Sequence, residues 1–543
     1  MSILGNLTDT ERVESHRPWP RVVVNESGWR LTAGQLAKGE RELVALWGEK
    51  DSVHLAIRCP AANEFAVLSL VCVDGTYPSL SQFHPPALRL ERAIRDLYGL
   101  VPEGLPDERP WLDHGRWGIK HPLAIQPNVS WPPEERATQV APLGVFDHRA
   151  DARWLGGPAK PGHDNSLVSN SQSSTTNYAF LPATGDSLHQ VAVGPVHAGI
   201  IEPGFFQFTA SGEIVVRLEE RLGYVHKGIE SLMTGADLEH GTRLAGRVSG
   251  DSTVAYAFAF ARAVEAALGI EAPPRAQWLR ALMGEIERIA NHLGDFGAIC
   301  NDASFAIMQA QCAILRERVL RAAGACFGHR LMRDCIRIGG VAVDLSADAI
   351  AALSRLAMEI GLRLPRLTEL YDKTASLQDR TVGAGFLSSK LARQYACGGF
   401  VGRASGREFD ARKAIAYPPF DRIAFEAPVL EEGDVNARVW IRIREIEQSV
   451  SIVRQILDRL PAGPLRIEFE IRPGEGVALV EGFRGDIFAS VRIGENGAIE
   501  RCHLRDQSWF QWPLLEAASE GNIVADFPLC NKSFNCSYSG HDL

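Results

Sequence analysis

Residues 273–300 read PPRAQWLRALMGEIERIANHLGDFGAIC, and this stretch decides the fold class of the chain. A stripe of apolar side chains at steps of three and four residues lies along one face of an α-helix, and proline is favoured in the first helical turn. The sequence therefore predicts a long helix that begins at Pro273 and buries one face in a helix-rich unit. The stripe consists of Trp278, Leu279, Leu282, Met283, Ile286, Ile289, Leu293 and Phe296.

A second long helix is predicted further along the chain. Helical periodicity dominates residues 241–370, and another apolar stripe occupies residues 434–460. Asp434 stands where a helix N-cap belongs, and Pro461 stands where the helix must stop. Three arginines of this second helix are expected on its surface, facing solvent or a partner subunit: Arg438, Arg442 and Arg444.

The first helix also carries a polar face. Glu285, Arg288 and His292 are spaced i, i+3 and i+7, so they share one side of the helix. Such a face is either solvated, internally paired, or the wall of a cavity between helices. We favour the cavity wall.

The chain divides into three parts by composition. Residues 1–118 are predicted to form a small α+β domain. Residues 119–190 are crowded with Pro, Gly, Ser and Asn and predict a linker, which proteases should cut first within residues 164–177. Residues 191–543 form the second domain, which opens with a strand pair and includes residues 465–491, whose alternating pattern predicts an antiparallel sheet.

The fold class is thus α+β and multidomain: a small α+β N-terminal domain, then a helix-rich domain with a peripheral antiparallel sheet. In the first domain, strands are expected at Val22–Val24, Val53–Cys59 and Phe65–Val73, and a helix at Ala87–Leu97 that stops before Gly99.

The composition excludes several classes of protein. Of 543 residues, 45% are hydrophobic and 23% charged, which is typical of soluble globular proteins, and the net charge of -9 argues against general nucleic-acid binding. Apolar runs such as Phe65–Val73 are far shorter than the ~20 residues that cross a bilayer, and Met1–Glu26 lacks a secretory signal, so a cytoplasmic location is expected.

No two of the ten cysteines form a C-x-x-C pair. They are expected to be buried, reduced thiols, including Cys300, Cys312, Cys326 and Cys335.

Several short motifs resemble one protein family in order and spacing. They are Gly194–Gly204 (GPVHAGIIEPG), Arg221–Glu230 (RLGYVHKGIE), Leu268–Gln277 (LGIEAPPRAQ), Ile338–Val341, Asp421–Arg422, Gly433–Asp434 with Arg438, Gln448–Ser449 and Leu460–Pro464. This set resembles the large subunits of membrane-bound energy-converting nickel-iron hydrogenases and the related quinone-proximal subunit of respiratory complex I. The resemblance covers roughly residues 191–543.

The first domain extends the resemblance. Tyr77–Leu80, Leu90–Gly99 and Pro106–Asp107 look like the small subunit that sits beside the large one in complex I. Fusion of the two is typical of the large subunits of hydrogenase-4 and formate hydrogenlyase complexes.

The resemblance implies where a metal centre would be. The family holds nickel and iron with two C-x-x-C pairs, because soft thiolates must bridge both metals. Here Ser249 and Ser252 stand at the first pair, and Ser537 and Gly540 at the second. Serine hydroxyls are poor substitutes for thiolates, so no metal-ligating residue and no cofactor bound by this chain itself are expected, with quinone kept as a candidate ligand.

The quinone-binding positions of the complex I branch are also altered. The histidine position falls at Ile201 or Glu202, and the tyrosine position at Arg247. Glu202 resembles a proton-relay carboxylate of the hydrogenase branch. We therefore name Glu202, Arg247 and Asp251 as catalytic candidates, with Arg247 and Asp251 as an ion pair. The ordinary alternatives are a turn cap at Glu202 and a structural pair at the other two.

The two ligand loops are expected to enclose a polar cavity. The candidates for binding a cofactor there are His197, Ser249, Ser537, His541 and Asp542, although a histidine in a Gly-Pro turn is more often structural.

The implied function is that of a large subunit in a complex-I-like membrane oxidoreductase that lacks the nickel-iron cysteines. Its implied partners are an iron-sulfur small subunit, which would carry the nearest cluster, antiporter-like membrane subunits, and a quinone or an NADH-linked electron donor. The chain would be active only in this complex, as a peripheral subunit on the cytoplasmic side of the membrane. The alternatives are an NADH-quinone type subunit with a remodelled quinone pocket, and a redox-inactive structural or coupling subunit.

Overall fold

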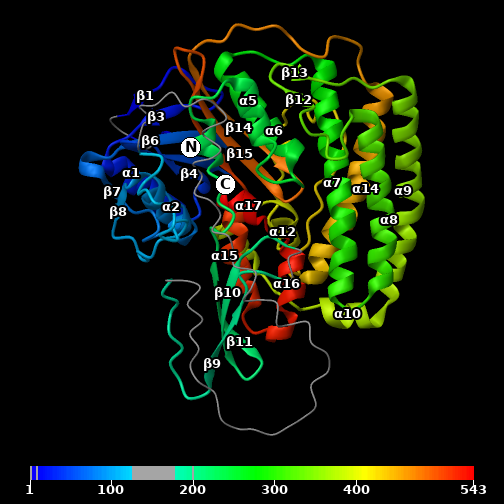
Figure 1. Ribbon diagram of the computed structural model, residues 1–543, viewed down its shortest axis with the longest axis horizontal. Helices are drawn as coiled ribbons and strands as arrows, with labels where there is room; N and C mark the ends of the chain where they lie inside the picture. Colours follow the sequence, from blue (N-terminus) through cyan, green and yellow to red (C-terminus); the bar gives the residue numbers. More distant parts are fainter. Residues whose placement is uncertain (1–2, 6, 8–9, 125–177, 198–200) are drawn as a thin grey trace.

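The computed structural model describes residues 3–5, 7, 10–124, 178–197 and 201–543. The stretch at residues 164–177, where proteolysis is expected, lies outside these ranges. Within them the chain combines two larger sheets, a three-stranded sheet and a bundle of long helices (Figure 1). No helix in the described ranges is long and apolar enough to cross a membrane.

The N-terminal part is built on a five-stranded sheet with strand order β1-β3-β6-β5-β4. Its strands are β1 (Glu11–Arg12), β3 (Arg21–Val23), β4 (Glu42–Gly48), β5 (Ser52–Cys59) and β6 (Glu64–Val71). Helices α1 (Glu26–Ala37) and α2 (Leu88–Tyr98) and the parallel pair β7 (Thr76–Pro78) and β8 (Val101–Glu103) complete this part. The predicted strands and helix are confirmed, and α2 ends where Gly99 takes a left-handed conformation with φ 75°.

A three-stranded antiparallel sheet follows, with the order β11-β10-β9. Its strands are β9 (Leu188–Val193), β10 (Phe205–Ser211) and β11 (Ile214–Arg221). Because β9 begins at Leu188, this sheet includes the last residues assigned to the linker. Tyr178, also in that assigned linker, accepts a hydrogen bond of 2.8 Å from Arg92 of α2.

Long helices form a bundle on one side of the molecule (Figure 1). Helix α7 (Pro274–Asp302) packs against α8 (Ala306–Phe327) and α14 (Val435–Arg459), and α9 (Ala347–Lys373) covers α8 and α14. Both predicted long helices are confirmed. Asp434 is the N-cap of α14, and its side chain accepts a hydrogen bond of 2.7 Å from the backbone N–H of Ala437.

The C-terminal sheet joins a short strand from the N-terminal part of the chain to three strands from the C-terminal part. Its order is β16-β15-β14-β2, where β14 (Gly474–Gly482), β15 (Gly485–Ile493) and β16 (Ile499–Arg505) are antiparallel and β2 (His16–Arg17) runs parallel to β14. The alternating pattern predicted from residue 465 becomes a strand only at Gly474. Helix α6 (Thr253–Leu268) crosses this sheet closely, because a Cβ at Gly476 would lie 2.1 Å from the carbonyl oxygen of Ala263.

The remaining elements are short and connect or cover these layers. They are α4 (Ile229–Met233), α5 (Leu238–Ala245), β12 (Ile336–Arg337), β13 (Gly340–Val341), α10 (Ala375–Thr381), α11 (Ser389–Gln394), α12 (Gly399–Ala404), α13 (Ala411–Ala414), α15 (Ser508–Ser519), α16 (Phe527–Phe534) and α17 (Tyr538–Asp542), with short 3-10 turns at Val73–Gly75, Pro85–Ala87 and Val524–Asp526. The ten cysteines are buried and free, as predicted.

The predicted arginine surface of α14 is wrong for two of its three members. Arg438 and Arg442 are fully buried, and Arg444 alone is exposed. Arg442 donates hydrogen bonds to Asp295 (3.1 Å) and to the carbonyl oxygen of Ser533 (2.7 Å). A helical period cannot distinguish an exposed arginine from one whose charge meets a carboxylate on a neighbouring helix.

Candidate functional site

The two loops at the expected cysteine positions meet in the structure. The Oγ atoms of Ser537 and Ser249 lie 3.3 Å apart, and the backbone N–H of Gly540 donates to Ser537 Oγ at 2.9 Å. Ser252 stands as the N-cap of α6 and Ser537 as the N-cap of α17. We call Ser249, Ser252, Ser537 and Gly540 the serine junction.

Asp251 and Arg484 form the charged centre beside this junction. Two hydrogen bonds of 2.9 and 2.5 Å join the guanidinium to both carboxylate oxygens. Ser249 and Ser252 donate to the same carboxylate at 2.6 and 3.3 Å. Burial alone raises the pKa of Asp251, but Arg484 and the two hydroxyls outweigh it and lower that pKa to about 2. Asp251 is therefore a fixed negative charge at neutral pH.

Glycine at position 540 is required by close packing. A Cβ there would lie 2.7 Å from Asp506 Oδ2 and 2.9 Å from Ser537 Oγ. Asp506 accepts a hydrogen bond of 2.7 Å from the hydroxyl of Tyr256, which anchors it in place. A larger residue at Gly540 would have to displace this pair.

The residues of the junction do not fit a nickel-iron centre. Three hard hydroxyl oxygens and a glycine stand at the thiolate positions, and the hydroxyls bond to one another and to Asp251. Among the described residues, no three side chains of His, Cys, Asp or Glu are grouped so that they could hold a metal ion.

The expected pair between Arg247 and Asp251 is wrong. Arg247 instead forms a two-pronged ion pair with Asp334, at 2.6 and 2.8 Å, and its side chain is 40% exposed. Asp251 pairs with Arg484 at the turn between β14 and β15. Its partner is 233 residues away in sequence, so local spacing gave no sign of it.

Glu202 and His197 lie at the edge of the junction. Glu202 is exposed, and its carboxylate accepts a hydrogen bond of 3.0 Å from the backbone N–H of Ser539. His197 Nε2 is 2.7 Å from the carbonyl oxygen of Gly204, which closes its own turn. Of the two, Glu202 contacts the C-terminal loop directly.

His541 and Asp542 lie deeply buried at the end of α17. His541 Nε2 accepts from the indole N–H of Trp111 at 3.1 Å, so Nδ1 carries the proton that faces Asp542 at 2.8 Å. The ring of Trp509 stacks on His541 with a centroid distance of 4.0 Å. Burial lowers the pKa of His541, against the opposing effect of Asp542.

Asp542 also holds a second segment of the chain. Its two oxygens accept from the backbone N–H groups of Gly223 and Val225 at 2.9 and 3.0 Å. His541 and Asp542 were predicted from the sequence, whereas Trp111, Arg484 and Asp506 were not, since no local pattern links such distant positions.

The polar face of α7 is an internally paired network. His292 Nε2 is 2.7 Å from Glu445 on α14, and Glu445 also meets Arg403 at 2.5 Å. Arg288 bonds to backbone carbonyls at the end of β14, and Glu285 accepts from Arg412 at 2.8 Å. The favoured cavity wall is therefore wrong, and the alternative of internal pairing holds.

One carboxyl group in this network has an unusual pKa. Burial, and next the nearby Asp410, raise the pKa of Glu481 to about 7, against the lowering effect of Arg403. Glu481 accepts hydrogen bonds of 3.0 Å from Arg403 and 2.9 Å from the backbone N–H of Ala411. A carboxyl group with such a pKa can hold or release a proton near neutral pH.

Family descriptions match three separate parts of the chain. Residues 49–129 match the respiratory-chain NADH dehydrogenase 30 Kd subunit, residues 227–300 match nickel-dependent hydrogenase, and residues 304–472 match the respiratory-chain NADH dehydrogenase 49 Kd subunit. The order of these matches is that of a small subunit followed by a large one.

Curated relatives and a solved structure agree with these matches. Formate hydrogenlyase subunit 5 of Escherichia coli K12 is 31% identical over 470 residues, which span 86% of this chain and 77% of the relative. An NADH-quinone oxidoreductase subunit of Phocaeicola vulgatus is 28% identical over 491 residues, 88% of this chain and 89% of the relative. A chain of the membrane-bound sulfane sulfur reductase, an archaeal respiratory membrane complex, superimposes with a TM-score of 0.63 and 26% identity, covering 66% of this chain and 99% of its own. The chain therefore belongs to the family of complex-I-like large subunits shared by energy-converting hydrogenases and NADH-quinone oxidoreductases, with the small partner subunit fused ahead of the large one.

Proposed function

We propose that the chain is the large subunit of a membrane-associated oxidoreductase that does not activate hydrogen and instead serves the reduction of a quinone. The observation that carries this proposal is the hydrogen-bonded serine junction with its Asp251–Arg484 pair. It stands where the family's thiolates would hold nickel and iron, and it offers hydroxyl donors and a fixed ion pair instead.

The chemistry of the junction suits proton handling at a quinone. Reduction of a quinone to a quinol needs two electrons and two protons, and the electrons would come from an iron-sulfur cluster in a partner subunit. The hydroxyl of Ser249 is engaged by Asp251, whereas that of Ser537 donates to Ser249 at the longer distance of 3.3 Å and can turn to donate to a headgroup oxygen instead. Arg484 can stabilise negative charge that develops there. Glu202, exposed and bonded to the C-terminal loop, is the group that would exchange protons with solvent.

The proposed assembly follows the family. An iron-sulfur small subunit would face the serine junction, antiporter-like membrane subunits would anchor the complex, and this chain would be peripheral on the cytoplasmic side. Identification of the subunits that copurify with this chain would show whether the electron donor is NADH-linked.

The test uses the complex purified with its partner subunits. We expect no stoichiometric nickel by elemental analysis, no hydrogen uptake, and quinone reduction that Asp251→Asn lowers by about 100-fold. Asp251 holds Arg484 in place, and the loss of one preorganised group that stabilises developing charge costs roughly 10²–10³-fold. Asp334→Asn, which breaks only the exposed pair with Arg247, is the matched control and should leave the rate unchanged. Near-stoichiometric nickel together with hydrogen uptake would refute the proposal.

Restoring the first cysteine pair should not restore a metal centre. In Ser249→Cys/Ser252→Cys we expect no gain of nickel or of hydrogen uptake, because the second pair is still missing. Gly540 cannot accept a cysteine while Asp506 keeps its place, since a Cβ there would lie 2.7 Å from Oδ2. Nickel bound by the double variant would contradict the expectation that the second pair is needed.

A redox-inactive coupling subunit is the second candidate. The paired network between α7 and α14 favours it. Glu285, Arg288 and Glu445 form buried ion pairs, and moving the two helices apart would leave buried charges without compensation. The same purified complex distinguishes the two functions. Intact electron supply from the small subunit without quinone reduction, and without nickel, would select the coupling role.

A further inference from the structure

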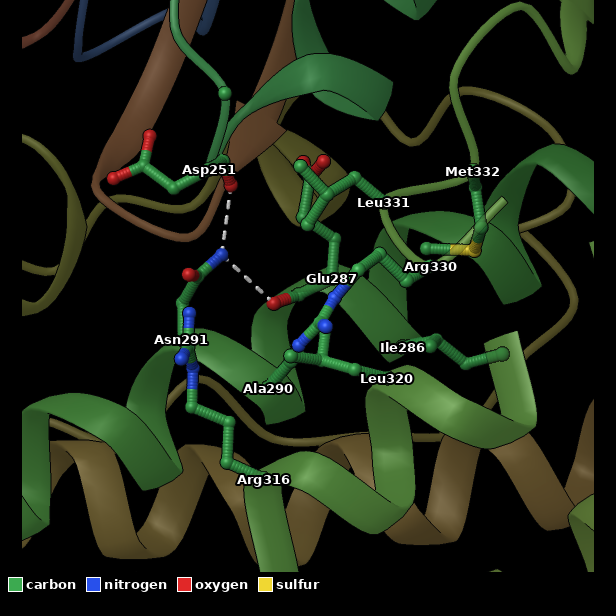
Figure 2. Close-up of a pocket in the computed structure, with 11 residues that line it drawn as sticks. Asp251, Ile286, Glu287, Ala290, Asn291, Arg316, Leu320, Arg330, Leu331 and Met332 are labelled. Atoms are coloured by element: carbon green, nitrogen blue, oxygen red, sulfur yellow. Dashed lines mark hydrogen bonds between the residues drawn. The ribbon is translucent and has the colours of Figure 1, made fainter. Parts of the chain in front are cut away.

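A pocket lies behind the loop that carries Asp251, between α7, α8 and residues 330–332 (Figure 2). Its volume is about 130 Å³. Since roughly 10–15 Å³ is enough to hold one water molecule, a small organic ion fits. Most of the wall is apolar and is formed by Ile286, Ala290, Leu320, Leu331 and Met332.

Two arginines bring positive charge to this apolar pocket. Arg316 of α8 extends beside Asn291, and Arg330 reaches in from the opposite loop (Figure 2). Arg316 forms no hydrogen bond or ion pair with any residue in the described ranges. Arg330 has one carboxylate partner, Glu317, at 2.8 Å on the exposed side.

The position of Arg316 is built into the helix packing. A Cβ at Gly294 of α7 would lie 3.0 Å from Cδ and 3.1 Å from Nε of Arg316. A glycine inside a helix costs about 1 kcal/mol relative to alanine, so its presence here has a packing reason. Gly294 leaves the groove along which the arginine lies.

The acidic groups at the pocket are already engaged elsewhere. The carboxylate of Asp251 turns toward Arg484, and only its backbone carbonyl faces Asn291, at 2.7 Å (Figure 2). Glu287 uses both oxygens to accept from the backbone N–H groups of Val254 and Ala255, at 2.7 and 3.1 Å. Neither carboxylate neutralises Arg316, so the pocket has room and charge for an anion.

We propose that this pocket binds a small organic carboxylate, with its head on Arg316 and Arg330 and a short alkyl tail against Ile286, Leu320 and Met332. A guanidinium matches a carboxylate with two parallel hydrogen bonds. The apolar walls favour an alkyl tail over a fully hydrated inorganic anion such as phosphate, which would lose its water without gaining apolar contact. The ligand would touch the back of the loop that carries Ser249 and Asp251, and its binding does not depend on any redox activity.

The test measures the binding of sodium butyrate, acetate and phosphate to the full chain by calorimetry and by thermal unfolding at matched ionic strength. We expect saturable butyrate binding in about the millimolar range, as suits a ligand of few atoms, with weaker acetate and no saturable phosphate effect. Arg316→Gln and the exposed Arg330→Gln should each weaken butyrate binding by about tenfold or more.

Arg318→Gln is the matched control, since it removes the same charge from the same helix. Arg318 pairs with Glu359, and a residue two positions along α8 points to a different side. It should leave butyrate binding unchanged. The proposal is overturned if no ligand binds saturably, if phosphate binds as well as butyrate, if both pocket variants bind like the wild type, or if Arg318→Gln weakens binding as much as they do.

Discussion

Arg442 shows how a single buried charge can support the junction of two helices. It is fully buried, and its guanidinium bonds to Asp295 on α7 and to the backbone of Ser533 in α16. Removing one partner of a buried pair leaves the other charge without compensation. The side chain also stacks on Phe400, with 3.6 Å between the guanidinium carbon and the ring centroid.

We therefore expect Arg442→Ala to lower the free energy of unfolding by about 3–5 kcal/mol. Arg444→Ala, two residues along the same helix and exposed, should change it by less than about 0.5 kcal/mol. Urea denaturation of both variants checks this prediction. Equal midpoints would mean that water or a rearranged side chain compensates Asp295.

Glu287 makes a prediction about pH. Burial raises the pKa of Glu287 to about 8, against the lowering effect of Val254 and Ala255. A carboxyl group whose pKa is higher in the folded state binds more protons there, so it stabilises the fold at low pH and loses that contribution as pH rises. The window runs from the ordinary value of 4.5 to about 8.

The expected result is a decline in stability between pH 5 and 8 that is smaller in Glu287→Gln than in the wild type. Glutamine stays neutral throughout, so any constant cost of the substitution cancels in the slope. Unfolding midpoints across this range are the measurement. The same slope in both proteins would show that Glu287 is ionised in the fold.

At the scale of elements, helices α7 and α8 approach each other through a glycine. A Cβ at Gly297 would lie 2.9 Å from the Cβ of Cys312 and 3.0 Å from the Cα of Gln309. Both are rigid parts of α8. Gly284 on the same helix has nothing within 4 Å of the corresponding point.

This contrast gives a paired prediction for one helix. Gly297→Ala should destabilise the protein by about 1–3 kcal/mol through overpacking, despite the better helix propensity of alanine. Gly284→Ala should stabilise it by up to about 1 kcal/mol, because only propensity changes. Thermal unfolding of the two variants decides the matter, and a gain in both would mean that α8 shifts without cost.

What the sequence could predict depends on how local the cause is. Helices α7 and α14 follow from a period of three and four residues and from the cap at Asp434, all within one segment. The meeting of Ser249 with Ser537 was predictable only through the family resemblance, which relates positions far apart. The partners Arg484 and Asp334 followed from neither, because their ion pairs depend on how loops pack in three dimensions.

At the scale of the molecule, the N-terminal part is bound to the rest by many contacts. Strand β2 pairs with β14, Arg21 pairs with Glu475, and Arg492 pairs with Glu49 at 2.6 Å. Trp47 contacts both Phe488 and His503, with centroid distances of 5.4 and 5.3 Å. These contacts are of the kind that hold a stable interface together.

We predict that residues 1–124 and 178–543, produced as two chains in one cell, copurify as a complex. Residues 1–124 alone should aggregate, because the apolar face around Trp19 and Trp47 would be exposed. Copurification and gel filtration provide the measurement. A monomeric, well-folded fragment of residues 1–124 would show that its domain is self-sufficient.

The pairing of β2 with β14 has a consequence for the order in which the chain folds during synthesis. The strand at His16–Arg17 leaves the ribosome early, while its partner at residues 474–482 is still to be made. At roughly 5–20 residues per second, the wait is on the order of half a minute to a minute and a half. During that time the apolar rings of Trp19 and Trp47, which pack on Phe488 in the finished fold, are without this partner. Exposed apolar surface makes such species prone to aggregate, so we expect nascent chains to depend on chaperones until the C-terminal sheet emerges.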